Sequence, residues 1–191
     1  MEDLLQDAET RIQHGDFEAA IGLLQNVLVE EPDNPRALTD IGVAFTESGE
    51  NRKAMKALDF CLKLEPNNVE ALEAMGCSYL REHEYPSARY YLEQARDTDP
   101  ENASVLRNLS VLYNQTGFQR ESRDALLKSY ELNPDDYLTL YALSFSYLNA
   151  GDGDKAAETL AQLLEMEVPE DIRELAEQQL VKIQGGAAGA S

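Results

Sequence analysis

The sequence has few of the residues that bind metals, nucleic acids or anionic membranes. Its 191 residues contain no tryptophan, two cysteines and two histidines. A structural zinc site normally needs four cysteine or histidine ligands, so none is expected. Lys and Arg number 16 against 36 Asp and Glu, which gives a net charge of −20. Nucleic acids and anionic membrane surfaces both attract clustered basic residues, so neither is an expected partner.

Long apolar runs are also missing. No stretch approaches the ~18 apolar residues of a transmembrane helix. The start, Met1-Glu2-Asp3-Leu4-Leu5, has neither the basic region nor the apolar region of a signal peptide. Hydrophobic residues nevertheless make up 43% of the chain, which is enough to build a packed core. We therefore expect a soluble, acidic, cytoplasmic protein.

A period of 34 residues organises most of the chain. Four prolines recur at this interval: Pro32, Pro66, Pro100 and Pro134. Two residues after each proline stands a residue that caps helices well: Asn34, Asn68, Asn102 and Asp136. Because proline cannot continue a helix, each junction predicts the end of one helix and the start of the next.

Each 34-residue unit is broken once more near its middle. Glycine recurs there as Gly15, Gly49, Gly117 and Gly151, and His83 takes the same place in the third unit. Glycine at this place indicates a tight turn, so each unit is predicted to be two helices of ~12–14 residues. The apolar residues between these breaks follow helical spacing.

These residues resemble the tetratricopeptide repeat family, in which apolar and small residues recur at fixed offsets through 34 positions. The second unit matches with Leu38, Ile41-Gly42, Phe45, Ala54, Leu58 and Pro66, and the third with Leu72, Met75-Gly76, Tyr79, Ala88, Leu92 and Pro100. The resemblance implies an all-α, right-handed superhelical solenoid of five helix pairs, over about 1–34, 35–68, 69–102, 103–136 and 137–170. The first unit fits least well, because Asp7 and Arg11 replace expected apolar and aromatic residues.

The end of the sequence predicts a capping helix and a tail. Residues 170–184 carry one apolar stripe on an otherwise polar helix: Ile172, Leu175, Ala176, Leu180 and Ile183. Such a helix is typical of a cap that covers the last repeat of a solenoid and faces water on its other side. Residues 185–191 are Gly, Ala and Ser, and we expect a flexible tail. A single solenoid is thus expected over residues 1–184.

The resemblance further implies a concave groove lined by the first helix of each pair. Carried over by position, the acidic half of the groove contains Glu2, Glu9, Arg36, Thr39, Asp40, Glu47, Glu70, Glu73 and Arg81. The other half, with apolar residues and an Arg/Asn edge, contains Arg107, Asn108, Val111, Asn114, Leu138, Tyr141 and Phe145. An alternative is that the capping helix or a second copy of the chain covers Tyr141 and Phe145.

No catalytic constellation, metal site or cofactor site is expected. Asp152-Gly153-Asp154 lacks the remaining ligands of a calcium loop, so a helix N-cap at Asp152 or Asp154 is the preferred interpretation. The predicted function is protein–protein interaction, as a scaffold, adaptor or chaperone-like module rather than an enzyme. The expected ligand is a partner segment that is apolar at one end and basic at the other. Two alternatives stay open: a self-associating structural module, and a regulatory repeat segment of a larger enzyme.

Overall fold

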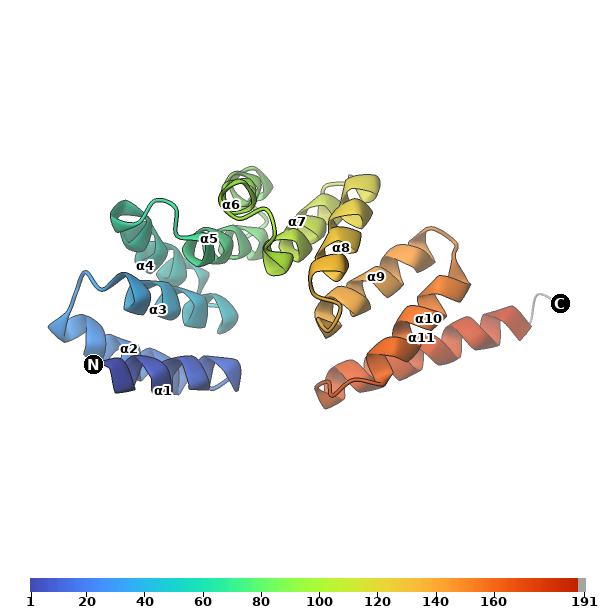
Figure 1. The fold of residues 1–191 in the computed structure, drawn as a ribbon, viewed down its shortest axis with the longest axis horizontal. Coiled ribbons are helices and arrows are strands. Elements are labelled where there is room, and N and C mark those ends of the chain that lie inside the picture. Colours follow the sequence, from blue (N-terminus) through green and yellow to red (C-terminus); the bar gives the residue numbers. More distant parts are fainter. Residues whose placement is uncertain (189–191) are drawn as a thin grey trace. The chain divides into compact units, whose positions relative to one another are not determined.

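Eleven α-helices follow one another along residues 1–188, the part of the chain that the structure, a computed structural model, describes. Their bounds are α1 (Glu2–Gln13), α2 (Phe17–Glu30), α3 (Pro35–Glu47), α4 (Asn51–Leu64), α5 (Val69–Arg81), α6 (Tyr85–Thr98), α7 (Ala103–Gln115), α8 (Gln119–Leu132), α9 (Tyr137–Asn149), α10 (Gly153–Leu164) and α11 (Glu170–Ala188). The first ten form five pairs, as predicted, and the fold is a helical repeat solenoid (Figure 1). No described helix is long and apolar enough to cross a membrane.

The predicted junction signals act as expected. The side chains of Asn34, Asn68 and Asn102 accept hydrogen bonds from backbone N–H groups three residues later, at 3.0, 2.9 and 3.1 Å. Asp136 caps α9 by accepting from the N–H of Leu138 at 3.1 Å. Each cap satisfies a donor that the first turn of a helix would otherwise leave unpaired.

The turns inside the pairs also follow the prediction. The four glycines have φ between +76° and +86°, the left-handed region that side chains with a Cβ rarely enter. His83 adopts the same conformation, with φ 61°, although it carries a side chain. Its imidazole Nδ1 lies 3.2 Å from the hydroxyl of Tyr85.

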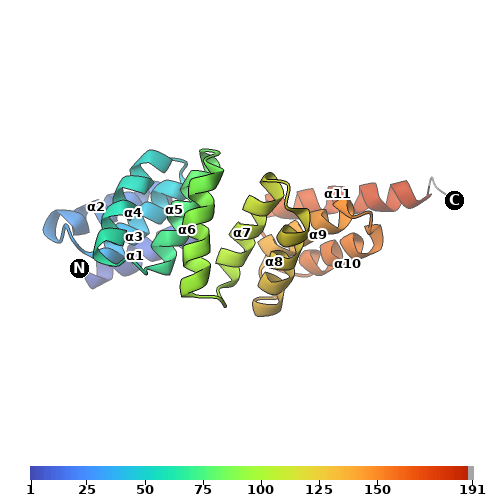
Figure 2. The same ribbon diagram turned by 90° about the horizontal axis from the view of Figure 1, so that it is seen from above.

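The chain divides into two compact units, residues 1–101 and 102–191, and each is described by itself. A continuous solenoid over residues 1–184 therefore stays a prediction. In the first unit, α1 to α6 pack as successive pairs, and α3 contacts the first helices α1 and α5 on either side (Figures 1 and 2). Gly42 and Gly76 are the close-contact points, because a Cβ on either would lie within 2.6 Å of Leu58 or Leu92.

The second unit contains α7 to α10 and the capping helix α11. Leu140, Leu160, Leu163 and Ala176 form a buried cluster that joins α9, α10 and α11. Ile172, Leu180 and Ile183 pack against this cluster, so most of the predicted stripe faces it, but Leu175 is exposed.

The predicted end of the capping helix is corrected by the structure. Helix α11 continues to Ala188, four residues into the stretch expected to be a tail. Once a helix has formed, each further residue adds a hydrogen bond without a new nucleation cost, so α11 continues beyond the apolar stripe that predicted it. Residues 189–191 of the expected tail lie outside the described residues.

Candidate protein-binding surfaces

The predicted groove residues lie on first helices in both units. In the first unit, Asp40 and Glu47 lie on α3, whereas Glu70, Glu73 and Arg81 lie on α5. In the second unit, the predicted residues on α7 are Arg107, Asn108, Val111 and Asn114, and those on α9 are Leu138, Tyr141 and Phe145. Each unit also contains a hollow lined by some of these residues.

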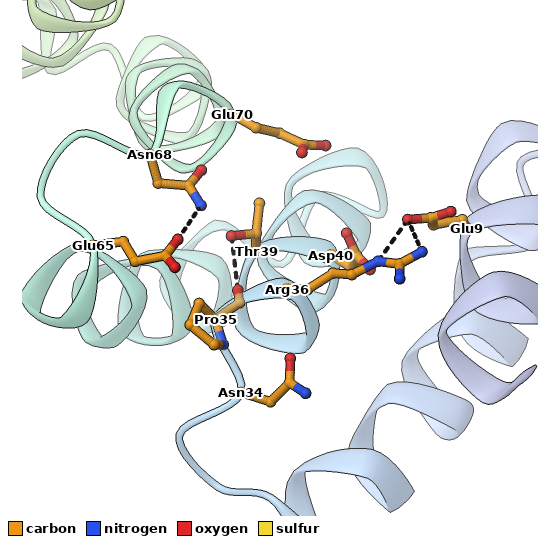
Figure 3. Close-up of a pocket in the computed structure, with 9 residues that line it drawn as sticks. All are labelled: Glu9, Asn34, Pro35, Arg36, Thr39, Asp40, Glu65, Asn68 and Glu70. Atoms are coloured by element: carbon orange, nitrogen blue, oxygen red, sulfur yellow. Dashed lines mark hydrogen bonds and ion pairs between the residues drawn. The ribbon is translucent and has the colours of Figure 1, made fainter. Parts of the chain in front are cut away.

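The hollow of the first unit has a volume of about 410 Å³ and lies among α1, α3 and α5. Its lining residues are Glu9, Asn34, Pro35, Arg36, Thr39, Asp40, Glu65, Asn68 and Glu70. Figure 3 shows that Glu9, Asp40 and Glu70 reach this space from three different helices. The repeat phase placed five of these residues in the predicted groove: Glu9, Arg36, Thr39, Asp40 and Glu70. Asn34 and Asn68 were predicted only as helix caps, and Pro35 and Glu65 were not predicted to line the site.

Asp40 is the unusual member of this set. Asp40 is only 5% exposed. Its Oδ2 atom has no hydrogen-bond partner among the described residues. Burial raises the pKa of Asp40 to about 7, and the negative charges of Glu70 and Glu9 add to the rise, whereas Arg36 opposes it. Near neutral pH this carboxyl group therefore carries its charge only part of the time.

Arg36, the basic residue nearest to Asp40 in the sequence, forms its hydrogen bonds with other carboxylates. Its guanidinium donates to Glu9 Oε1 at 2.9 and 2.6 Å and to Glu2 Oε1 at 2.6 Å. These hydrogen bonds raise the pKa of Arg36 and join α3 to α1. Figure 3 shows the guanidinium turned toward Glu9.

Two further predicted residues pair with each other. Arg81 Nη2 lies 3.0 Å from both carboxylate oxygens of Glu47, and the two residues hold the same position in successive repeats. This ion pair reduces the negative charge that Glu47 offers to a ligand. Glu70, in contrast, stands at the hollow with a raised pKa, because the walls limit its hydration and because Glu73 and Glu9 carry like charges.

The predicted binding face of the second unit exposes apolar side chains. Val111, Leu138 and Phe145 are 37%, 39% and 37% exposed. Val111, Asn114 and Phe145 line a hollow of about 150 Å³ together with residues of α8. The ring of Tyr141 meets Phe145 edge to face, with centroids 5.0 Å apart. Tyr141 also packs against the cluster that contains Ala176 of the capping helix, so it is the less accessible of the two rings.

Arg107 has an internal role in the second unit. Its guanidinium donates to the carboxylate of Asp136 and, at 3.2 Å, to Ser104 Oγ. Asp136 is the N-cap of α9, so this ion pair holds α7 against the start of α9. A peptide carboxylate or carbonyl at Arg107 would have to compete with Asp136. This partner, 29 residues away, had no signal in the sequence.

Comparisons with known proteins agree on the family. Sequence profiles described as tetratricopeptide repeat match residues 11–76, 73–137 and 138–166. No curated protein sequence matches the chain. Among solved structures, a thermophilic TPR protein of Thermus thermophilus has a TM-score of 0.86 at 20% identity, covering 94% of this chain and 98% of its own.

MamA proteins share the fold at lower similarity. The MamA fragment from residue 41 of Desulfovibrio magneticus RS-1 has a TM-score of 0.65 at 24% identity, covering 86% of this chain and 93% of its own. Another MamA structure reaches 0.64 at 22% identity, covering 83% and 92%. With three repeat profiles that together extend from residue 11 to residue 166, the chain belongs to the tetratricopeptide repeat family.

Proposed function

We propose that this chain is a protein-interaction module that binds segments of a partner protein on the first-helix faces of its repeats. Tetratricopeptide repeats generally serve as non-catalytic interaction modules. The observation that carries the proposal is the exposed apolar face of α7 and α9. Val111 and Phe145 border a hollow there, and Leu138 is exposed on α9. The acidic hollow of the first unit supports a partner that also carries basic residues.

The apolar face suits a partner segment with apolar side chains. An exposed apolar patch next to polar groups is typical of an interaction surface. Phe145 offers a large ring that loses little conformational freedom on binding, and such residues often dominate the binding energy. Asn114 beside it supplies both a donor and an acceptor for the backbone of an extended peptide.

A displayed peptide library tests this proposal. We expect selection on the intact chain to yield peptides with apolar anchors, whose Kd is measured by fluorescence anisotropy. Leu138→Ala and Phe145→Ala should each weaken binding about thirtyfold or more, which corresponds to the ~2 kcal/mol of a hot spot. Leu132→Ala is the matched control, because Leu132 has the same 39% exposure as Leu138 but lies at the end of the second helix α8.

Two results would contradict the proposal. One is that the selected peptides bind all three variants as they bind the parent chain. The other is that Leu132→Ala weakens binding as much as Leu138→Ala. Sedimentation analysis separates the self-association alternative: a dimer that dissociates on Phe145→Ala would identify a second copy, rather than a partner, as the occupant.

A further inference from the structure

We propose that the hollow of the first unit is a pocket for the guanidinium group of an arginine side chain, with Asp40 as its buried anion. The arginine belongs to the partner protein, so this inference rests on the proposed function and deepens it. The acidic residues of the first unit would then bind one arginine side chain specifically, in place of a general attraction for basic residues.

The unpartnered oxygen of Asp40 points to a ligand. Buried carboxylates are normally paired or hydrogen-bonded, because removing their charge from water is costly. Asp40 Oδ2 lacks any partner among the described residues, yet the residue lines a hollow that is open to solvent and large enough for a side chain. Oδ2 itself is closed to water. A turn of the carboxyl group toward the hollow would let a donor from outside the chain supply the missing hydrogen bond.

The charges around the hollow select a cation. Four carboxyl groups line it, those of Glu9, Asp40, Glu65 and Glu70. Arg36, the one cation among the described residues that line it, is already bonded to Glu9 and Glu2. An incoming anion would meet an excess of negative charge, whereas a cation would relieve the repulsion between Glu70, Glu9 and Asp40.

The shape of the site favours guanidinium over a bare metal ion. Among the described residues, no three His, Cys, Asp or Glu side chains converge as metal ligands would. The carboxyl groups of Asp40 and Glu70 instead approach a space of about 410 Å³ from two helices (Figure 3). A guanidinium has five N–H donors in a fixed plane, so it can bond two separate carboxylates at once.

Proton release should accompany binding. The groups that face Asp40 are Glu9 on α1, Arg36 on α3, and Glu70 on α5 with Glu73 beside it. The thiol of Cys61 on α4 also lies close enough to interact with its charge. Since the pKa of Asp40 is about 7, a bound cation favours the ionised form and displaces the proton. Affinity for the cation should therefore rise between about pH 6 and about pH 8.

The experiment uses N-acetyl-arginine methylamide as the probe and the intact, ¹⁵N-labelled chain as the target. We expect NMR shifts confined to amides around Arg36–Asp40 and Glu70, with tighter binding at pH 8 than at pH 6. The citrulline analogue, which has the same shape without the charge, should bind at least about fivefold more weakly. Asp40→Asn should weaken arginine binding by a similar factor.

The controls separate a specific pocket from general acidity. Glu18→Gln removes one exposed carboxylate from the second helix α2 and should leave binding unchanged. Glu70→Gln changes an exposed residue of the pocket instead of a buried one, and it should also weaken binding of the arginine probe. Equal weakening by Glu18→Gln and Asp40→Asn would overturn the proposal, and so would shifts spread over the acidic surface. Nα-acetyl-lysine methylamide binding as tightly as the arginine probe would overturn the choice of guanidinium.

This test and the test of the proposed function fail separately. The arginine probe does not involve Leu138 or Phe145, so the pocket is judged even if no peptide is selected. Conversely, selected peptides that depend on Phe145 but tolerate Asp40→Asn and carry no enriched arginine would leave the proposed function intact and refute the pocket.

Discussion

At the scale of single residues, Asp40 is a charge that the fold holds in an unfavourable place. Its pKa is raised to about 7, so between about pH 4 and pH 7 the folded chain keeps a proton that the unfolded chain has lost. The folded state therefore binds more protons in this window, and the contribution of Asp40 to stability falls as the pH rises.

Asp40→Asn should remove the loss of stability that ionisation of Asp40 causes as the pH rises. We expect the variant to gain ~2–4 kcal/mol in free energy of unfolding at pH 8 relative to the parent chain, and clearly less at pH 5. Urea unfolding followed by circular dichroism at both pH values measures the difference. Glu18→Gln serves as the control for a change in net charge. An Asp40→Asn variant that is less stable than the parent at pH 8 would mean that the carboxylate has a stabilising partner after all.

At the scale of helices, glycine has opposite roles in α2 and α3. A Cβ at Gly42 would lie 2.4 Å from Leu58 Cδ2, and Leu58 is fully buried, so it has little room to move. A Cβ at Gly22 would meet nothing within 4 Å. The same substitution therefore creates a clash in one helix and only improves helix propensity in the other.

We expect Gly42→Ala to lower the free energy of unfolding by ~1–3 kcal/mol and Gly22→Ala to raise it by ~0.5–1 kcal/mol. Gly76→Ala should behave like Gly42→Ala, because its Cβ would lie 2.6 Å from Leu92 Cγ. Thermal melts of the three variants give the comparison. Serine holds the equivalent place in α7 and α9, as Ser110 and Ser144, so helix pairs of this protein can be spaced for a Cβ when the sequence demands it. If Gly42→Ala and Gly22→Ala shift the melting temperature alike, helices α3 and α4 can also move apart to accommodate a Cβ.

At the scale of the whole molecule, the net charge of −20 should make stability depend on salt. Ion pairs such as Arg81 with Glu47 offset only part of the repulsion among 36 acidic residues. Raising sodium chloride from ~20 to ~300 mM shortens the Debye length from about 20 to about 6 Å and screens this repulsion.

We therefore expect the melting temperature to rise by a few degrees over that range, measured by circular dichroism at constant pH. Potassium chloride should act like sodium chloride, since the effect is screening and not ion binding. A melting temperature that falls with added salt would show that attractive ion pairs outweigh the repulsion.

Local signals explain why so much of the fold could be predicted. Proline ends a helix, asparagine caps the next one, and glycine permits the turn between two helices, each by acting on residues only a few positions away. The 34-residue period then placed residues such as Asp40 and Phe145 on first helices. The length of α11 was less predictable, because continuing a formed helix depends on small differences between neighbouring residues.

Only the tertiary structure decided what those side chains contact. Arg36 pairs with Glu9 and Glu2, and Arg107 with Asp136, across 27 to 34 residues of sequence. Asp40, on the same helix as Arg36, is left buried without a partner for Oδ2 among the described residues. Repeat spacing determines which face of a helix a residue occupies. A hydrogen bond requires two atoms within about 3 Å, and that distance is set only when packing brings the helices together.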